Sequence, residues 1–266
     1  MSADSPALHP LSAFLAPWLA GGTPGLSRLT AMARERRLVT GGGVALRFVE
    51  PSGGPEGYEE HAFTTGEIAT RPCNRHDFFN ALIWLAFPHS KAALNRRHHA
   101  ALVAARRAGC TERGELRDAL TQFDECGVVI AGCAPEIWQG LCEHRWREVF
   151  VERREELLRS TRFMVFGHAS HDALAAPFVG LCGKALFLEV DATWLELPVT
   201  AALASLDLRL AALFDERDFS PRDWQPLPLL GIPGATAESE QPDYYDDTRQ
   251  FRPPRTMRAG SSPGNR

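Results

Sequence analysis

The stretch RPCNRHDFFNALIWLAFP, residues 71–88, decides the fold of this chain. From His76 to Phe87 it is apolar at almost every position after the first turn. A helix that is apolar on all of its faces has to be buried on all sides. The sequence therefore predicts a central helix over 76–87, with Trp84 in the core, that ends where Pro88 breaks it.

Four further helices are predicted from a proline in the first turn or from apolar residues at helical spacing. Their ranges are 23–37, 90–107, 135–158 and 199–214. The helix over 135–158 has the clearest apolar stripe, opposite a face of glutamate and arginine. Helices are thus expected to dominate the fold.

Strands are predicted where apolar residues alternate or cluster between turn signals. Such segments occur at 44–49, 162–166 and 184–190, the last two on either side of a short segment at 168–176. Residues 121–131 are typical of a hairpin, in which Asp124-Glu125-Cys126-Gly127 would form the tight turn and Gly127 could adopt a positive φ.

The expected fold class is α+β, a helix-dominated single domain with short strands and hairpins. We expect an N-terminal segment over residues 1–22, the main domain over 23–253 and a disordered tail over 254–266. From Pro221 onward the chain is rich in proline and is predicted to be an irregular C-terminal extension.

Composition places the chain among globular proteins, since 44% of its residues are apolar and 23% are charged. Its net charge of −4 does not point to a polyanion partner for the whole surface. The acidic N-terminus lacks the positive charge of a secretory signal, and prolines interrupt the uncharged run 10–27. We expect no membrane span and a cytoplasmic location.

The six cysteines contain no C-x-x-C pair, and a disulfide framework is not expected in a chain of this length. Cys126, Cys133, Cys142 and His144 form the one subset that resembles a zinc site. On a helix, however, Cys142 and His144 would point about 200° apart, which argues against structural zinc.

The sharpest polar cluster consists of Arg71, His76, Asp77 and Asn80. One hypothesis is a buried site in which His76 is a base or metal ligand, Asp77 orients it or binds metal, and Asn80 and Arg71 hold substrate. In the alternative, Asn74 or Asp77 caps the helix and the other polar groups bind loop carbonyls.

Asp124 and Glu125 are a second candidate pair, because neighbouring carboxylates could complete a metal site with His76 and His168. A tight turn would also select these residues for its own geometry. His168 follows Gly167 at the end of a predicted strand, where functional residues often lie, although a lone histidine can equally be structural.

The segment 91–107 is basic and contains no acid. Lys91, Asn95, Arg96 and Arg97 could contact phosphates of a nucleic acid or another anion. Aromatic residues that would stack on bases are missing from it. Pairing with the acidic segment 238–247 within the same chain would explain the charge equally well.

Several motifs together resemble a known bacterial family, domain of unknown function 3025. They are Arg71-Pro-Cys-Asn-Arg-His-Asp-Phe-Phe-Asn80, Phe123-Asp-Glu-Cys-Gly-Val-Val-Ile130, Val165-Phe-Gly-His168 and Pro226-Leu-Pro-Leu-Leu-Gly-Ile-Pro-Gly234. The family pattern has tryptophan where this chain has Arg75, and a Glu-Lys-like end where this chain has Ser170-His171-Asp172. The resemblance implies that the chain belongs to this family. Because the family is one of unknown function, the resemblance does not imply any particular activity.

Two functional hypotheses remain open from the sequence. The first is an enzyme with a polar pocket at His76, Asp77 and Asn80 that performs metal-assisted hydrolysis with a divalent cation. The second is a non-catalytic binding or scaffolding protein that contacts an anionic partner through the 91–107 helix. An open cleft with converging side chains would favour the first.

Overall fold

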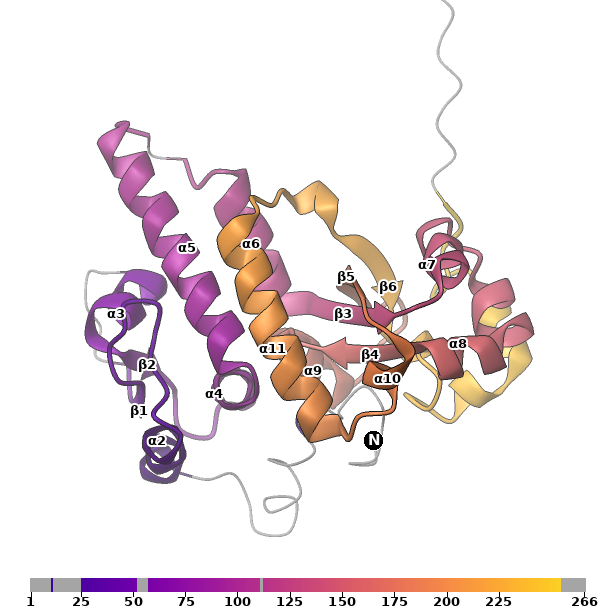
Figure 1. Cartoon of the computed structure of the whole chain (residues 1–266), viewed down its shortest axis with the longest axis horizontal. Helices are drawn as coiled ribbons and strands as arrows, with labels where there is room; N and C mark the ends of the chain where they lie inside the picture. Colours follow the sequence, from indigo (N-terminus) through magenta and orange to yellow (C-terminus); the bar gives the residue numbers. More distant parts are fainter. Residues whose placement is uncertain (1–10, 12–24, 52–56, 111, 255–266) are drawn as a thin grey trace, which may run out of the picture.

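The computed structural model describes residue 11 and residues 25–51, 57–110 and 112–254. Within these residues the fold is α+β and dominated by helices (Figure 1), which confirms the expected class. The expected N-terminal segment 1–22 and tail 254–266 lie, apart from Leu11 and Pro254, outside the described residues.

The larger of the two sheets has four strands in the order β4-β3-β5-β6. Strand β3 (Gly127–Gly132) pairs antiparallel with β4 (Thr161–Val165) and parallel with β5 (Cys182–Glu189). Strand β6 (Gln225–Pro228), from the C-terminal extension, pairs antiparallel with β5. The central strand β3 is buried along its whole length, as expected for a strand with partners on both edges and cover on both faces.

The helices and the smaller sheet account for most of the remaining chain. Strands β1 (Arg47–Val49) and β2 (Glu67–Ala69) form a parallel pair. The helices are α2 (Leu26–Glu35), α3 (Tyr58–Thr65), α4 (Arg75–Ala86), α5 (Pro88–Arg107), α6 (Glu115–Cys126), α7 (Pro135–Cys142), α8 (Arg154–Ser160), α9 (His168–Leu174), α10 (Ala192–Leu195) and α11 (Val199–Glu216).

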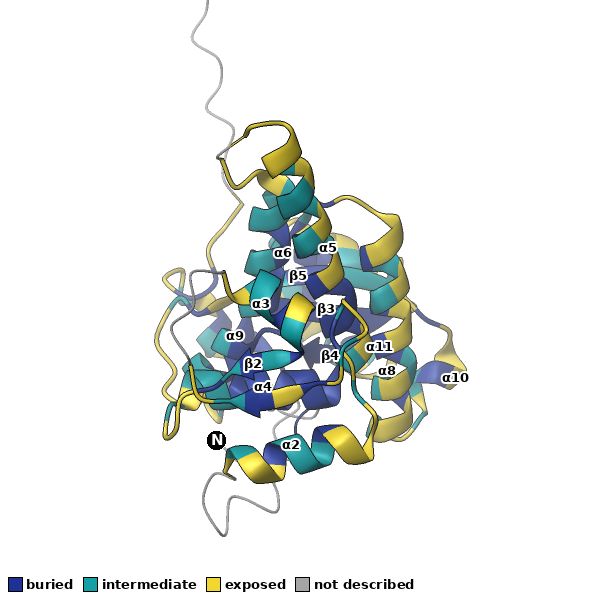
Figure 2. Cartoon of the chain, turned by 90° about the vertical axis from the view of Figure 1, so that its left-hand side faces the viewer, coloured by how far each residue is buried: buried dark blue, intermediate teal, exposed yellow. Residues whose placement is uncertain are grey.

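Helix α4 is the predicted central helix, and every residue from Phe79 to Ala86 is buried. Figure 2 shows α4 in the colour of buried residues except in its first turn. Trp84 is 1% exposed, which confirms its expected place in the core. The helix begins at Asn74, whose side chain accepts a hydrogen bond from the backbone N–H of Asp77.

Alternate residues of β3 face two separate cores. Val129 and Ala131 pack with α4, α6 and α11, whereas Val128 and Ile130 pack with α7, α8 and the C-terminal extension. The extension is irregular, as predicted, and its Tyr245 and Phe251 are buried in the second core. No helix among the described residues has both the length and the apolar character needed to cross a membrane.

The predicted hairpin at 121–131 is wrong. Residues 115–126 form helix α6, which leads directly into β3, and Gly127 has a φ of −64° rather than a positive one. Leu116, Ala119, Leu120 and Phe123 recur at helical spacing and pack into the first core. Asp124 and Glu125 therefore lie in the last turn of a helix, which aims their side chains differently from those of a hairpin turn.

The continuous helix predicted over 135–158 is also wrong in part. Helix α7 ends at Cys142, His144 adopts a left-handed φ of 58°, and a five-residue π-helix (Glu148–Glu152) precedes α8. This break folds the two helical pieces so that both Leu141 and Phe150 enter the second core.

Candidate metal centre

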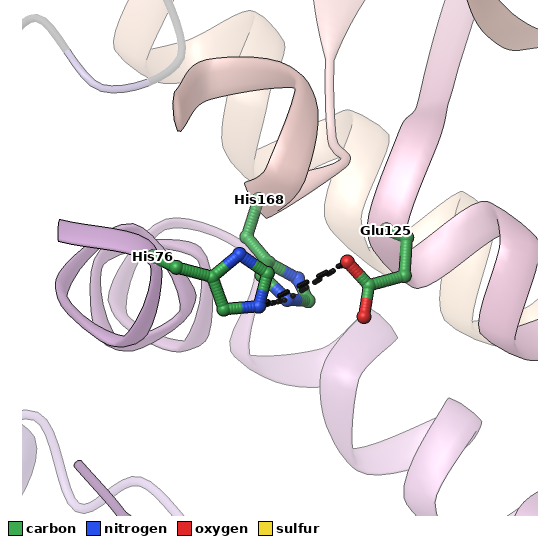
Figure 3. A group of neighbouring side chains, drawn as sticks. All are labelled: His76, Glu125 and His168. Carbon is green, nitrogen blue, oxygen red and sulfur yellow. Dashed lines mark hydrogen bonds and ion pairs between the residues drawn. The ribbon is translucent and has the colours of Figure 1, made fainter. Parts of the chain in front are cut away.

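Three helix ends meet where His76, Glu125 and His168 converge (Figure 3). His76 lies in the first turn of α4, Glu125 in the last turn of α6, and His168 begins α9. Gly167 allows this approach, because a Cβ there would lie 2.4 Å from the Glu125 carbonyl oxygen. Side chains from segments 92 residues apart thus reach one point.

The tautomer of His168 is fixed by its surroundings. Its Nδ1 lies 2.8 Å from the backbone carbonyl oxygen of Asp124, and a carbonyl can only accept, so Nδ1 carries the hydrogen. Burial lowers the pKa of His168 to about 4, despite the opposing effect of the nearby Asp124 carboxylate. The ring is therefore neutral at pH 7, and the lone pair on Nε2 points toward His76 and Glu125.

The distances suit a shared metal ion. The Nε2 atoms of His76 and His168 are 3.1 Å apart, and Glu125 Oε2 is 3.4 Å from His168 Nε2 and 4.0 Å from His76 Nε2. Ligand atoms around tetrahedral zinc, with bonds of about 2.0–2.2 Å, lie roughly 3.3 Å apart. The two histidine nitrogens are already close to this separation, and a rotation of the part-exposed Glu125 side chain would change only the two distances to its carboxylate. Among the described residues, this is the group of histidine, cysteine and acidic side chains close enough to hold an ion.

The centre opens on one side into a cavity of about 590 Å³. His168 is buried at its base, whereas the side chains of His76 and Glu125 are 38% and 39% exposed. Burial and the charge of Asp124 raise the pKa of Glu125, because both disfavour its ionised carboxylate. A bound cation would stabilise this carboxylate through its positive charge. An ion held here would have open coordination positions facing the cavity.

A buried ion pair supports the base of the centre. Lys91 of α5 is 3% exposed, and its Nζ donates to Asp124 Oδ1 at 2.6 Å and to Asn80 Oδ1 at 3.0 Å. Asn80 in turn donates to the hydroxyl of Tyr58 at 2.9 Å. Burial opposes the charges, but their mutual attraction prevails, lowering the pKa of Asp124 and raising that of Lys91. Because Asp124 also holds His168, this network positions a candidate ligand.

The structure separates Asp77 from the residues it was expected to join. The Asp77 carboxylate accepts from the backbone N–H and the guanidinium of Arg71 at 2.8 and 2.9 Å. Asn74 caps the helix, as one of the alternatives had it. Asn80 lines the cavity and binds Lys91, and Asp124 stands behind His168 rather than beside His76. Of the predicted metal ligands, the structure brings together His76 and Glu125, with His168 between them.

The basic segment of α5 pairs with acids of its own chain, but not with the segment 238–247. Arg96 binds Asp215, Arg97 binds Asp218, and Asn95 binds Glu59 and the backbone N–H of Gly41. The alternative of pairing with 238–247 is wrong, because that segment lies on the second core, where Arg147 and Arg154 bind its acids. These bonds already engage the arginines that were candidates for anion binding.

The cysteines are all free, and the set Cys126, Cys133, Cys142 and His144 forms no close group among the described residues. His144 instead contacts the backbone carbonyl of Arg252 through Nδ1, at 3.2 Å.

Sequence reasoning missed Tyr58, which approaches the centre from α3. No local sequence pattern marks a single tyrosine hydroxyl as part of a site.

Comparison with known proteins adds the family. The model of a family described as a protein of unknown function, DUF3025, matches residues 46–255. The chain belongs to the DUF3025 family. The matched range contains His76, Glu125 and His168 together with the Lys91–Asp124 pair. No curated protein and no solved structure gave a match.

Two residues at which departures from the DUF3025 pattern were expected, Arg75 and Asp172, contact each other. Arg75 at the start of α4 forms an ion pair with Asp172 of α9. This ion pair joins α4 to α9 beside His76 and His168.

Proposed function

We propose that this protein is a metal-dependent hydrolase whose divalent ion is held by His76, Glu125 and His168. The observation that carries the proposal is the convergence of two histidine nitrogens and one carboxylate oxygen at the base of an open cavity. Two histidines and a glutamate are a known ligand set of catalytic zinc, in which the fourth position takes water.

The chemistry follows from the ligand set and the cavity. An ion with an open position lowers the pKa of bound water to about 7 and so supplies hydroxide at neutral pH. The protein's part is to keep His168 neutral, to fix its ring by the bond to the Asp124 carbonyl, and to leave the cavity side free. Such support of a ligating histidine by a backbone carbonyl is typical of catalytic metal sites.

A bacterial source and a cytoplasmic location belong to the same proposal. All six cysteines are free, and five of them are exposed, which suits a reducing compartment. The competing scaffold hypothesis would require the polar groups to be bound individually in a closed core, whereas His76 and Glu125 face an open cavity.

Zinc binding by the purified chain tests the proposal. After removal of metal with a chelator, calorimetric titration is expected to show one zinc ion per chain. His168→Ala should weaken binding by more than about 100-fold, since the loss of even an outer-shell partner costs roughly 10–100-fold. Glu125→Gln should also weaken it, and because Glu125 is half-exposed this variant should retain the fold.

The control is His89→Ala, which removes an exposed histidine of α5. Its zinc affinity should equal that of the wild type. The proposal would be overturned if the wild type took up no zinc, manganese or ferrous ion, or if folded Glu125→Gln protein bound them as tightly as the wild type. If the proposal holds, the zinc-loaded wild type should hydrolyse some of a panel of chromogenic esters, and the metal-free protein should not.

A further inference from the structure

Arg117 of α6 lines the same cavity. It makes no hydrogen bond or ion pair within the described part of the chain, and its Nε is shielded from solvent without an acceptor. A guanidinium has five N–H donors, and the Nε donor of Arg117 is unpaired away from water, which is costly. A ligand that offered an acceptor to this donor would remove the cost.

The other cations of the cavity wall are already engaged. Arg71 is held by Asp77 through two bonds, and Arg113 binds Asp118 and the hydroxyl of Thr121. Two acids of the cavity wall have partners as well. Glu60 forms an ion pair with Arg106, and Glu59 accepts a hydrogen bond from Asn95. Arg117 is thus the cavity-lining cation, among the described residues, whose charge is not compensated by a neighbour.

Helix geometry places Arg117 in line with the candidate metal centre. Arg117, Thr121 and Glu125 follow one another at intervals of four residues on α6, and all three line the cavity. The eight residues from Arg117 to Glu125 correspond to about 12 Å along the helix axis. Glu125 is at the inner end of the helix, and Arg117 is toward the exposed end that Figure 2 shows at the tips of α5 and α6.

The charge of the cavity favours a singly charged anion. A carboxylate can take two parallel hydrogen bonds from one guanidinium edge. A doubly charged phosphate would bring a second negative charge close to Glu59 and Glu60, with one free cation to balance it. Apolar wall residues such as Ala69 and Leu102 would suit the uncharged part of an elongated molecule.

We infer that the substrate carries a carboxylate that binds Arg117, at some distance along α6 from the bond that is hydrolysed at the metal centre. The inference rests on the proposed function, which supplies the position of the reacting bond. It names the substrate class: elongated molecules with a carboxylate at one end and a hydrolysable carbonyl group at the other.

The test uses probes that bind metal at one end. Monohydroxamates of α,ω-dicarboxylic acids, in a series of increasing methylene chain length, are compared with the matching terminal amides on the zinc-loaded protein. At the best chain length the acid is expected to bind at least about tenfold more tightly than the amide, as for a hydrogen-bonded charge pair. Arg117→Gln should abolish this preference without changing zinc affinity.

The matched control is Arg113→Gln, four residues before Arg117 and just ahead of α6, whose guanidinium already has Asp118 as a partner. It should keep the preference for the acid. Equal binding of acid and amide to the wild type, or a preference that survives Arg117→Gln, would overturn the inference. Tighter binding of a terminal phosphonate than of the carboxylate would overturn the choice of anion.

Zinc titration of the same samples separates the two claims. Zinc uptake without a preference for the acid contradicts the carboxylate site alone. Failure of the protein to bind any of the divalent ions contradicts the proposed function, and the inference falls with it.

Discussion

Lys91→Met is expected to lower the free energy of unfolding by roughly 3–5 kcal/mol, the usual cost of leaving one member of a buried ion pair without its partner. Lys91 is 3% exposed, and its ammonium is bound by Asp124 and Asn80. Methionine fills a similar volume, so the loss comes from the uncompensated Asp124 carboxylate rather than from a cavity. Denaturant unfolding measures it.

The chain offers a matched control, because its other lysine is Lys184. Lys184 forms no ion pair among the described residues, and Lys184→Met should change stability by no more than about 0.5 kcal/mol. The double variant Lys91→Met with Asp124→Leu removes both charges and should recover most of the lost stability. A Lys91→Met protein as stable as the Lys184→Met protein would show that the pair does not support the base of the cavity.

Stability is expected to fall as the pH decreases from 6.5 to 4, in part because of His171. Burial lowers the pKa of His171 from 6.5 to about 4. Between these values the unfolded chain binds a proton that the folded chain does not, so folding is fully favoured above pH 6.5 and loses roughly 3 kcal/mol as the pH reaches 4.

His171→Gln isolates this contribution. Glutamine does not titrate, and its amide can still donate to the Val165 carbonyl, which His171 Nε2 contacts at 3.0 Å. Between pH 7 and pH 4 the variant should lose about 2–3 kcal/mol less than the wild type, measured by urea unfolding. Equal losses in the two proteins would mean that His171 is protonated in the folded state.

The elements that sequence predicts well are those in which one strong pattern decides the structure. Helix α4 is apolar on all faces and has an asparagine cap, so both its existence and its burial could be predicted. The hairpin predicted over 121–131 was wrong because it relied on the turn-like composition of Asp124, Glu125 and Gly127. The apolar spacing of Ala119, Leu120 and Phe123 prevailed, because it buries this stripe against the first core.

The candidate site could be predicted in its residues and only partly in its geometry. His76, Glu125 and His168 were all nominated from the sequence as part of one hypothesis. Sequence neighbourhood also suggested Asp77, which the first turn of α4 directs to Arg71 instead. The sequence placed Lys91 in a basic segment that could bind an anion. Its burial could not be predicted, because its partner Asp124 is 33 positions away in the chain. Such pairings arise from tertiary packing and leave no local signal.

Anomalous diffraction at the zinc edge, from crystals of the chelator-treated protein soaked in zinc, tests the metal centre most directly. The account predicts one strong peak at about 2.0–2.2 Å from His76 Nε2, His168 Nε2 and a carboxylate oxygen of Glu125. The Lys91–Asp124 pair and the bond from His168 Nδ1 to the Asp124 carbonyl should remain in place. A zinc ion bound elsewhere, with the direct contact between His76 and His168 unbroken, would contradict the account.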